Sequence, residues 1–267
     1  MKLTVLVDNN TYIDRYFLGE PGVSYYIEDE GTKILFDTGY SDAFLRNAES
    51  MGIDTAKIDK LVFSHGHNDH TRGMRYYTGF REELEIVGCP TVFARKERDT
   101  GEEFGSPFRE EELKEKCRLH LSDKPVKISG HITFLGEIPT LFDFEKRYRL
   151  GKIVKHGRLV DDYLYDDSAM VFQNAQGLFV ITGCSHSGIC SIIEYAKQVC
   201  HEERVLGVIG GFHLFENDDR TKKTIEYLAE SKIEQLYPCH CVSLKVKTEM
   251  AKALDIREVG VGLALDI

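Results

Sequence analysis

The sequence has no apolar run that approaches the roughly 20 residues of a membrane-spanning helix. Its first apolar stretch, residues 3–7, ends at Asp8 and is shorter than the roughly 7–15 residues of a signal-peptide core. Short-period repeats and low-complexity segments are also missing. We therefore expect a soluble protein without a membrane partner, in which the 42% of hydrophobic residues builds a sizeable core.

Positive charge is also scarce: 34 Lys and Arg stand against 44 Asp and Glu, so the formal net charge is −10. Because nucleic-acid affinity depends on clustered cations that meet phosphates, this balance argues against a nucleic-acid partner. The seven cysteines are an odd number and lack the regular spacing of a disulfide framework. We interpret them as reduced thiols and predict a cytoplasmic location.

Short apolar runs with β-branched residues, bounded by Gly, Asp or Asn, predict strands at residues 3–7, 24–27, 33–36, 60–63, 91–94, 169–172, 178–181 and 205–209. Helical patterns occupy residues 42–51, 189–200, 222–231 and 245–254. The second half therefore alternates strand and helix, whereas the first half opens with a meander of strands. At this length, the pattern predicts an α/β fold in a single domain over residues 1–267.

Residues 96–165 differ from the rest of the chain in their dense charge, interrupted apolar runs and three of the six prolines. We interpret this segment as an insertion between two similar α/β halves, and predict that it caps the active site. Its stretch FLGEIPTLFDF, residues 134–144, is too hydrophobic for a free loop. We expect that stretch to pack near the site or at a subunit contact.

The stretch LVFSHGHNDHTRGM concentrates three of the ten histidines and one aspartate within six residues after an apolar run. His65 and His67 alternate along the loop, so both can point to one side and clamp a metal ion. Asp69 and His70 stand where the chain turns into a helix and can face a second position close to the first. This spacing predicts two metals that share a bridging water, unlike the helical H-E-x-x-H arrangement that holds one zinc.

Three further histidines, His186, His213 and His240, each follow an apolar strand directly, as His65 does. In an open α/β sheet the carboxyl ends of strands gather at one rim, so we expect these side chains to lie close together. The remaining histidines lie in charged or irregular segments and are predicted to be solvent-exposed: His120, His131, His156 and His201.

With these residues the sequence resembles the metallo-β-lactamase superfamily, whose signature H-x-H-x-D-H matches HGHNDH from His65 to His70. It is similar above all to the branch named after 7,8-dihydropterin-6-methyl-4-(β-D-ribofuranosyl)aminobenzene 5'-phosphate synthase. The matching stretches are LVDNNT, FDTGYSDAFLRNAESMGID, FSHGHNDHTRGM, FLGEIP, ITGCSHSGI, IGGFHLF and PCHC. The resemblance implies a four-layer αβ/βα sandwich whose two sheets face each other, with metals at one edge.

The resemblance also implies two divalent metal ions, zinc in the first place, with manganese and iron as alternatives. One ion would be held by His65, His67 and His186, and the other by Asp69, His70 and His240. His213 would lie beside the site, available to the substrate or leaving group. Where the superfamily usually has a bridging aspartate after TG, this chain has Cys184, which could ligate as a thiolate.

Two neighbouring cations lower the pKa of a bridging water toward neutrality and clamp the attacking and leaving oxygens. Asp69 is placed to ligate and to orient the resulting nucleophile, and His213 to donate a hydrogen bond or proton. We therefore predict a metal-dependent hydrolase that acts on a phosphoester or ester of a small molecule.

Two alternatives stay open. The first is the branch's own synthase chemistry, which condenses a pterin diphosphate with a ribofuranosylaminobenzene phosphate. Few cations flank the motifs to help a diphosphate leave, apart from Arg72 and Arg75. The second is a non-catalytic metal or ligand sensor, against which the complete set of candidate ligands argues.

Overall fold

A computed structural model describes all 267 residues, and its larger sheet has seven strands in the order β16-β1-β2-β3-β4-β5-β7. The strands β1, β2 and β3 form the predicted antiparallel meander, and β3, β4, β5 and β7 run parallel. The bounds are β1 (Lys2–Val7), β2 (Ser24–Asp29), β3 (Thr32–Phe36), β4 (Lys60–Val62), β5 (Glu85–Gly88), β7 (Arg118–Leu121) and β16 (Ala264–Asp266).

The second sheet has six strands in the order β15-β14-β13-β12-β9-β8. Its parallel half confirms the predicted alternation, because β13, β14 and β15 are joined by α4 (Ile189–Cys200) and α5 (Asp219–Glu230). The helix α6 (Leu244–Met250) follows. The strand bounds are β8 (Val126–Lys127), β9 (Ile132–Phe134), β12 (Ala169–Asn174), β13 (Gly177–Thr182), β14 (Val205–Gly210) and β15 (Gln235–Pro238).

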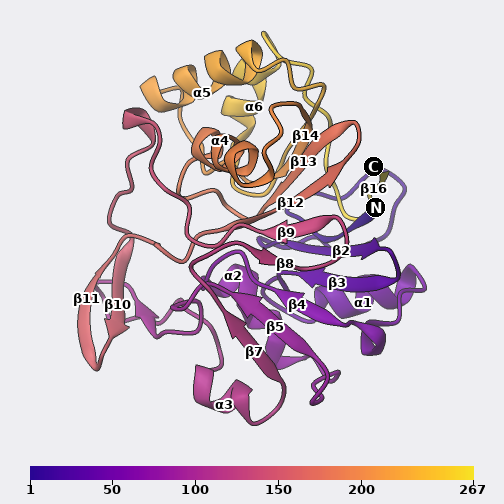
Figure 1. The fold of residues 1–267 in the computed structure, drawn as a ribbon, viewed down its shortest axis with the longest axis vertical. Helices are drawn as coiled ribbons and strands as arrows, with labels where there is room; N and C mark the ends of the chain where they lie inside the picture. Colours follow the sequence, from indigo (N-terminus) through magenta and orange to yellow (C-terminus); the bar gives the residue numbers. More distant parts are fainter.

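The elements form four layers, with α4, α5 and α6 on the outer face of the second sheet and α1 (Ala43–Ser50) on that of the first (Figure 1). Side chains alternate along each strand, so Leu35 packs toward Phe44 of α1 while Phe36 points into the layer between the sheets. That central layer holds 21 buried residues from both sheets. The predicted four-layer αβ/βα sandwich is confirmed.

Local capping explains where two of the helices begin. The side chain of Asp218 accepts a hydrogen bond from the backbone N–H of Thr221, so α5 starts three residues before the predicted 222. Ser243 caps α6 in the same way through the N–H of Val246. The predicted helices at residues 42–51 and 189–200 coincide with α1, including its caps, and with α4.

The strand predicted at residues 91–94 is wrong. These residues form turns, in which the N–H of Val92 bonds to the carbonyl of Cys89 and the N–H of Ala94 to that of Thr91. Val92 and Phe93 are buried beneath the first sheet, which accounts for their apolar character without a strand. The strand of this region is β5, which lies just upstream and pairs with β4.

The segment predicted as an insertion, residues 96–165, contributes strands to both main sheets, since β7 extends the first and β8 and β9 extend the second. The rest forms a small third sheet, in the order β11-β10-β6, that projects from the sandwich (Figure 1). Its strands are β6 (Lys96–Glu97), β10 (Gly151–Lys155) and β11 (Arg158–Asp162), with α3 (Glu110–Lys114) and the 3-10 helix η3 (Asp143–Glu145) between them.

The apolar stretch at residues 134–144 packs into the core of this chain. Leu135 and Ile138 join the buried layer beneath α4 and α5. The ring of Phe142 lies 5.4 Å from that of Tyr227 on α5. The stretch also contacts α4, where the backbone N–H of Leu141 donates to Ser191 Oγ at 3.2 Å, and its place near the site or at a subunit contact stays a prediction.

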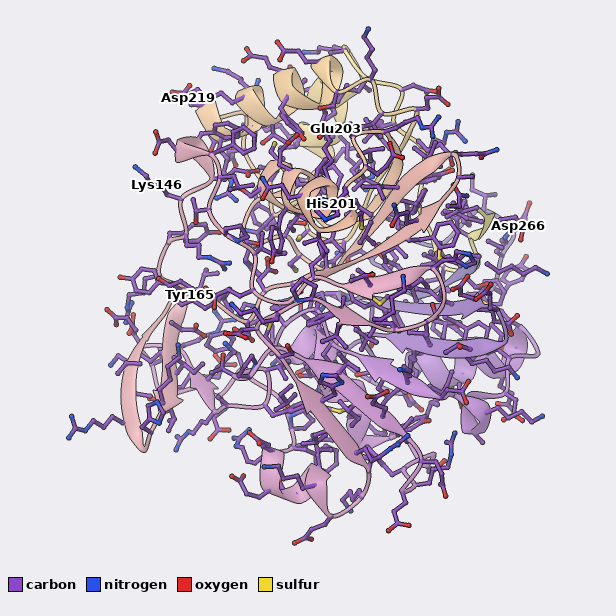
Figure 2. The ribbon with its side chains drawn as sticks, in the orientation of Figure 1. Lys146, Tyr165, His201, Glu203, Asp219 and Asp266 are labelled. Carbon is purple, nitrogen blue, oxygen red and sulfur yellow. The ribbon has the colours of Figure 1, made fainter.

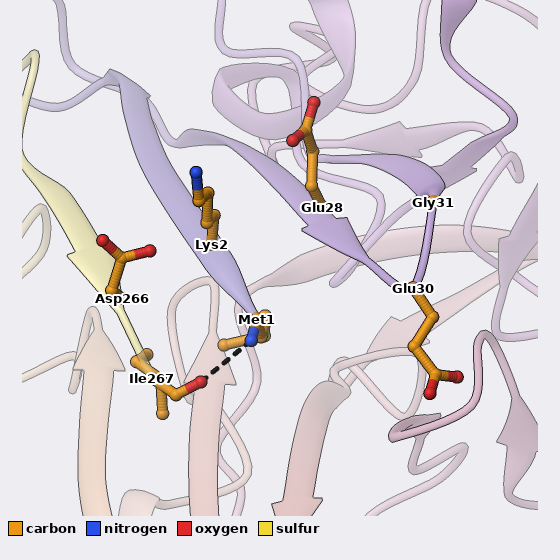
Figure 3. Close-up of a pocket in the computed structure, with 7 residues that line it drawn as sticks. All are labelled: Met1, Lys2, Glu28, Glu30, Gly31, Asp266 and Ile267. Atoms are coloured by element: carbon orange, nitrogen blue, oxygen red, sulfur yellow. Dashed lines mark hydrogen bonds between the residues drawn. The ribbon is translucent and has the colours of Figure 1, made fainter.

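The first and last strands pair at one edge of the larger sheet, where the Met1 ammonium donates a 2.8 Å hydrogen bond to the carbonyl of Ile267 (Figure 3). An open cavity of about 490 Å³ lies beside this pair and is lined by Glu28, Glu30 and Asp266. None of the predicted site residues lines it. No helix of the protein is both long enough and apolar enough to cross a membrane.

Candidate metal centre

Four strand ends deliver histidines to one rim. The loop after β4 carries His65 and His67, and the loops after β13, β14 and β15 carry His186, His213 and His240. The ring centroids of His65 and His67 lie 4.6 Å apart, and His186 lies 4.8 Å from the first and 5.0 Å from the second. One ligand nitrogen from each of these three rings lies within 4.8 Å of the others.

Hydrogen bonding fixes the tautomer of His65. The hydroxyl of Ser64 has one proton, which it donates to Asp37 Oδ2 at 2.6 Å. Ser64 Oγ must therefore accept from His65 Nδ1, 2.9 Å away, so His65 Nε2 carries a bare lone pair. That nitrogen is buried without a partner, and so are His67 Nε2 and both ring nitrogens of His186.

Burial lowers the pKa of His65 and of His186 well below the usual value, and lowers that of His67 to about 3. These rings are therefore neutral at physiological pH. Neutral imidazole with a free nitrogen is the form that binds a metal ion. The donor set fits a divalent cation, because buried polar atoms otherwise find hydrogen-bond partners.

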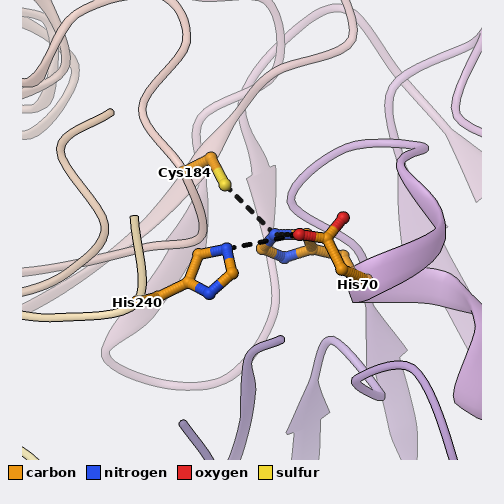
Figure 4. A group of neighbouring side chains, drawn as sticks. His70, Cys184 and His240 are labelled. Carbon is orange, nitrogen blue, oxygen red and sulfur yellow. Dashed lines mark hydrogen bonds and ion pairs between the residues drawn. The ribbon is translucent and has the colours of Figure 1, made fainter. Parts of the chain in front are cut away.

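A second group lies beside the first, since the ring centroids of His65 and His70 are 4.2 Å apart. Asp69 Oδ2 lies 3.4 Å from His240 Nε2 and 3.7 Å from His70 Nε2. Cys184 Sγ lies 3.2 Å from His70 Nε2, and both Cys184 and His240 point toward His70 (Figure 4). The candidate ligand atoms of these four residues lie within 4.8 Å of one another, so Cys184 is within reach of the predicted set, and its ligation stays a prediction.

The second group carries charge. Burial alone would lower the pKa of His70, but the negative charges of Asp69 and Asp37 outweigh it and raise the pKa to about 9. Burial raises the pKa of the Cys184 thiol well above its usual value. A cation bound to this group would therefore displace a proton from His70, as metal binding to protonated ligands does in general.

Sequence reasoning missed the groups that orient these ligands. Asp37 directly follows β3, is fully buried, and accepts a 2.7 Å hydrogen bond from His70 Nδ1. Asp8 and Asn9 follow β1: Asp8 Oδ2 accepts from the backbone N–H of His240 at 3.0 Å, and Asn9 Oδ1 lies 2.9 Å from His240 Nδ1. The rule used for the histidines, a polar residue directly after a buried strand, would have found Asp37 and Asp8.

His213 lies beside the first group, with its ring centroid 4.2 Å from that of His186. Its Nδ1 is 2.6 Å from the hydroxyl of Tyr148, which lies in the predicted capping segment. Burial and the positive charge of Arg220 lower the pKa of His213 to about 4, so its ring is neutral at physiological pH. A neutral His213 can donate a hydrogen bond toward a substrate while Tyr148 holds its other nitrogen.

The backbone around the site adopts the left-handed conformation at four residues that are not glycine. The φ angles are 57° at Asp37, 58° at Ser185, 49° at His213 and 50° at His240. Side chains other than Gly seldom adopt this conformation outside constrained positions. The surrounding sheets therefore hold the strand ends in geometries that the local sequence would not choose.

A buried ion triad lies beneath the loop that carries His65 and His67. The ammonium of Lys96, which is fully buried, donates to Asp162 at 2.7 Å and to Asp166 at 2.8 Å. Burial alone would lower the pKa of Lys96, but the charges of the two carboxylates raise it, so the ammonium stays charged. The other oxygen of Asp166 accepts a 2.8 Å hydrogen bond from the N–H of Gly66, between the two histidines.

We expect Asp166→Ala to weaken metal binding by about 10- to 100-fold, because removal of an outer partner of metal ligands typically costs that much. Asp162→Ala is the matched control, since it removes a carboxylate from the same lysine without touching Gly66. Both variants lose roughly 3–5 kcal/mol of stability through the broken buried pair. Metal titration of both folded variants is the measurement, and equal metal affinities would show that the triad serves stability alone.

The structure thus brings six predicted ligand residues to one rim, with His213 beside them: His65, His67, Asp69, His70, His186 and His240. Their binding of metal stays a prediction. His120, His156 and His201 are exposed as expected, with His201 at the end of α4 (Figure 2). The side chain of His131 is 41% exposed, and its N–H and ring also approach the buried carboxylate of Asp29.

Comparison with known proteins gives one family and several relatives. Residues 18–86 match the family model described as the metallo-beta-lactamase superfamily. A protein of Methanocaldococcus jannaschii, named uncharacterized protein MJ0448, is 31% identical over 257 residues, and the match covers 94% of each chain. The 7,8-dihydropterin-6-methyl-4-(beta-D-ribofuranosyl)-aminobenzene-5'-phosphate synthase of the same organism is 30% identical over 263 residues, covering 92% of this chain and 89% of its own.

A solved structure is similar over the whole length. The crystal structure of Tm1679, described as a metal-dependent hydrolase of the beta-lactamase superfamily, matches with a TM-score of 0.85 and 27% identity. The match covers 100% of this chain and 99% of that one. The agreement therefore includes the segment at residues 96–165 as well as the two sheets.

Proposed function

This chain belongs to the metallo-β-lactamase superfamily, and from that premise we propose that it is a binuclear metal-dependent hydrolase of a small-molecule phosphoester or ester. The observation that carries the proposal is the set of buried ring nitrogens without partners on His65, His67 and His186. Leaving such polar atoms unpaired is costly, and a bound cation would remove that cost.

The two groups divide the proposed ligands. The first cation would be held by His65, His67 and His186, and the second by Asp69, His70 and His240, with Cys184 within reach of the second. We propose zinc in the first place, and manganese or iron as alternatives, because nitrogen and oxygen donors suit all three. When bound, such a pair supplies an acidified water and charge neutralisation for the bond to be cleaved.

The side chains around this position have separate tasks in the proposal. Asp69 contributes the negative charge of the second group and faces both His70 and His240. His213 donates a hydrogen bond toward the leaving group, and Tyr148 holds the His213 ring in place. A cavity of about 400 Å³ opens beside His67 and Asp69, which suits a small molecule.

The test is metal analysis of protein purified without added metal, combined with a panel of phosphodiesters, phosphomonoesters and carboxylic esters. We expect about two divalent ions per chain and turnover of at least one class of substrate. A metal-free protein whose activity does not respond to zinc, manganese or iron would overturn the proposal. Metal-loaded protein that is inert toward the whole panel would favour the sensor alternative.

The synthase alternative has one observation in its favour, the 30% identity to the protein named as a synthase. A condensation of a pterin diphosphate with a ribofuranosylaminobenzene phosphate releases diphosphate, whereas ester hydrolysis does not. Measurement of diphosphate release from those two substrates, next to hydrolysis of simple esters, separates the two reactions.

Because the net charge is −10 and all seven cysteines are unpaired, we further propose a cytoplasmic protein without nucleic-acid or membrane partners.

A further inference from the structure

Two adjoining cavities lie on the side of the site that carries Asp69. The first, of about 400 Å³, is lined by His67 and Asp69 of the site and by the rings of Tyr40 and Phe104. The second, of about 260 Å³, shares Tyr40 and Asn68 with the first. A molecule whose reactive group lies at Asp69 can therefore extend past the Tyr40 ring into the second cavity.

The second cavity is lined by three arginines and two glutamates: Arg72, Arg75, Arg109, Glu102 and Glu103. Both glutamates already have cationic partners. Glu103 lies 2.9 Å from Arg95 and 2.9 Å from Arg109, and Glu102 lies 3.4 Å from Arg98.

The structure shows no ion pair for Arg72 or Arg75. The guanidinium of Arg72 lies over the ring of Tyr40, 4.1 Å from its centroid, and no acidic group neutralises it there. In a chain with 44 acidic residues and 34 basic ones, two unpaired arginines at one cavity are an excess of positive charge. Arginine presents a planar fork of donors that matches phosphate and carboxylate oxygens.

The fold fixes this pair relative to the metal ligands. Arg72 and Arg75 are the ends of the 3-10 helix η2 (Arg72–Arg75), which follows α2 (Asn68–Thr71) without a break. Residues three apart in a 3-10 helix lie on the same side, so the two guanidinium groups share a face. Gly73 between them donates a 3.0 Å hydrogen bond to the carbonyl of Gly39, and a side chain there would collide with Thr38.

We propose that Arg72 and Arg75 select substrates that carry a second oxyanion, separate from the group that is cleaved. This inference rests on the proposed hydrolase function. The substrate class is a small molecule with a phosphate or carboxylate at its far end and a planar or apolar portion between. That middle portion lies against Tyr40 and Phe104, while the reactive group lies at Asp69.

The experiment compares phenyl phosphate with a series that bears a para carboxylate directly or through one or two methylene groups. For metal-loaded wild type, we expect the best carboxylated member to exceed phenyl phosphate by about tenfold in kcat/KM and in calorimetric affinity, as one charge-assisted contact allows. In the R72A/R75A double variant this ratio should fall toward one. The matched control is K127A/K222A, which removes two exposed lysines without ion pairs and should keep the wild-type ratio.

The outcomes separate the two proposals. Absence of hydrolysis throughout the series counts against the hydrolase. Calorimetric binding to metal-loaded protein still measures how much the arginine pair contributes to affinity for the carboxylate. A wild type that binds no carboxylated member more tightly than phenyl phosphate would overturn the arginine proposal. So would a double variant that keeps the wild-type ratio.

Discussion

Asp69→Asn is expected to lower turnover by about a hundredfold or more, a barrier increase of about 3 kcal/mol. Asp69 supplies a carboxylate between His70 and His240, with its Oδ2 3.7 and 3.4 Å from their Nε2 atoms. The amide keeps the shape but removes the charge that would hold the second cation. Metal content should fall toward one ion per chain, because His65, His67 and His186 are unchanged.

The measurement is bound metal and kcat on one preparation across pH. Asp143→Asn is the control, because that carboxylate is 96% exposed and pairs only with Lys146. It should behave like wild type. If Asp69→Asn also kept wild-type metal content and turnover, Asp69 would leave the mechanism and the two-ion proposal would lose its second site.

Removal of the metal ions by a chelator is expected to abolish turnover and to lower the unfolding temperature. A ligand at about 100 times its dissociation constant stabilises the native state by about 2.7 kcal/mol. For a chain of this size, each kcal/mol shifts the unfolding temperature by about 2–4 °C. Calorimetric scans with and without chelator should therefore differ by roughly 5–10 °C, and added zinc should restore both properties.

Two variants test whether the effect of the chelator on the unfolding temperature depends on the proposed first site: His186→Ala removes a proposed ligand, and His120→Ala is the control. His186 has both ring nitrogens buried without partners, whereas His120 is exposed on β7. Added metal should raise the unfolding temperature of His186→Ala only weakly. It should raise that of His120→Ala as much as it raises that of the wild type. A wild-type response of His186→Ala would contradict the proposed first site.

Local patterns in the sequence were sufficient to predict much of the fold and the ligand set. The alternation of β13, α4, β14 and α5 depends on short apolar runs and the residues that bound them. His65, His186, His213 and His240 each lie within four residues of the end of a strand. Residues 91–94, wrongly predicted as a strand, are as apolar as the true strands, but they form turns whose apolar side chains are buried. Composition alone does not distinguish these two ways of burying Val92 and Phe93.

A strand-end rule would have placed Asp8 and Asp37 at the rim, but the partner of each orienting group could not be predicted, because the two members of a pair come from distant parts of the chain. Asp166 is 100 residues from Gly66, and Asp8 is 232 residues from His240. No local period relates such pairs, and they meet only when the two sheets pack face to face. Tyr148 reaches His213 across 65 residues in the same way.

We expect the left-handed backbone at Asp37, Ser185, His213 and His240 to lower the thermal stability of this protein while it holds the geometry of the proposed site. Each such residue costs on the order of 1–2 kcal/mol relative to an ordinary conformation, within a total stability of about 5–15 kcal/mol for a domain. Substitutions that relax these strand ends would raise the unfolding temperature while they displace the ligands. Laboratory evolution for thermal tolerance alone should therefore accumulate changes at this rim and yield robust, inactive descendants.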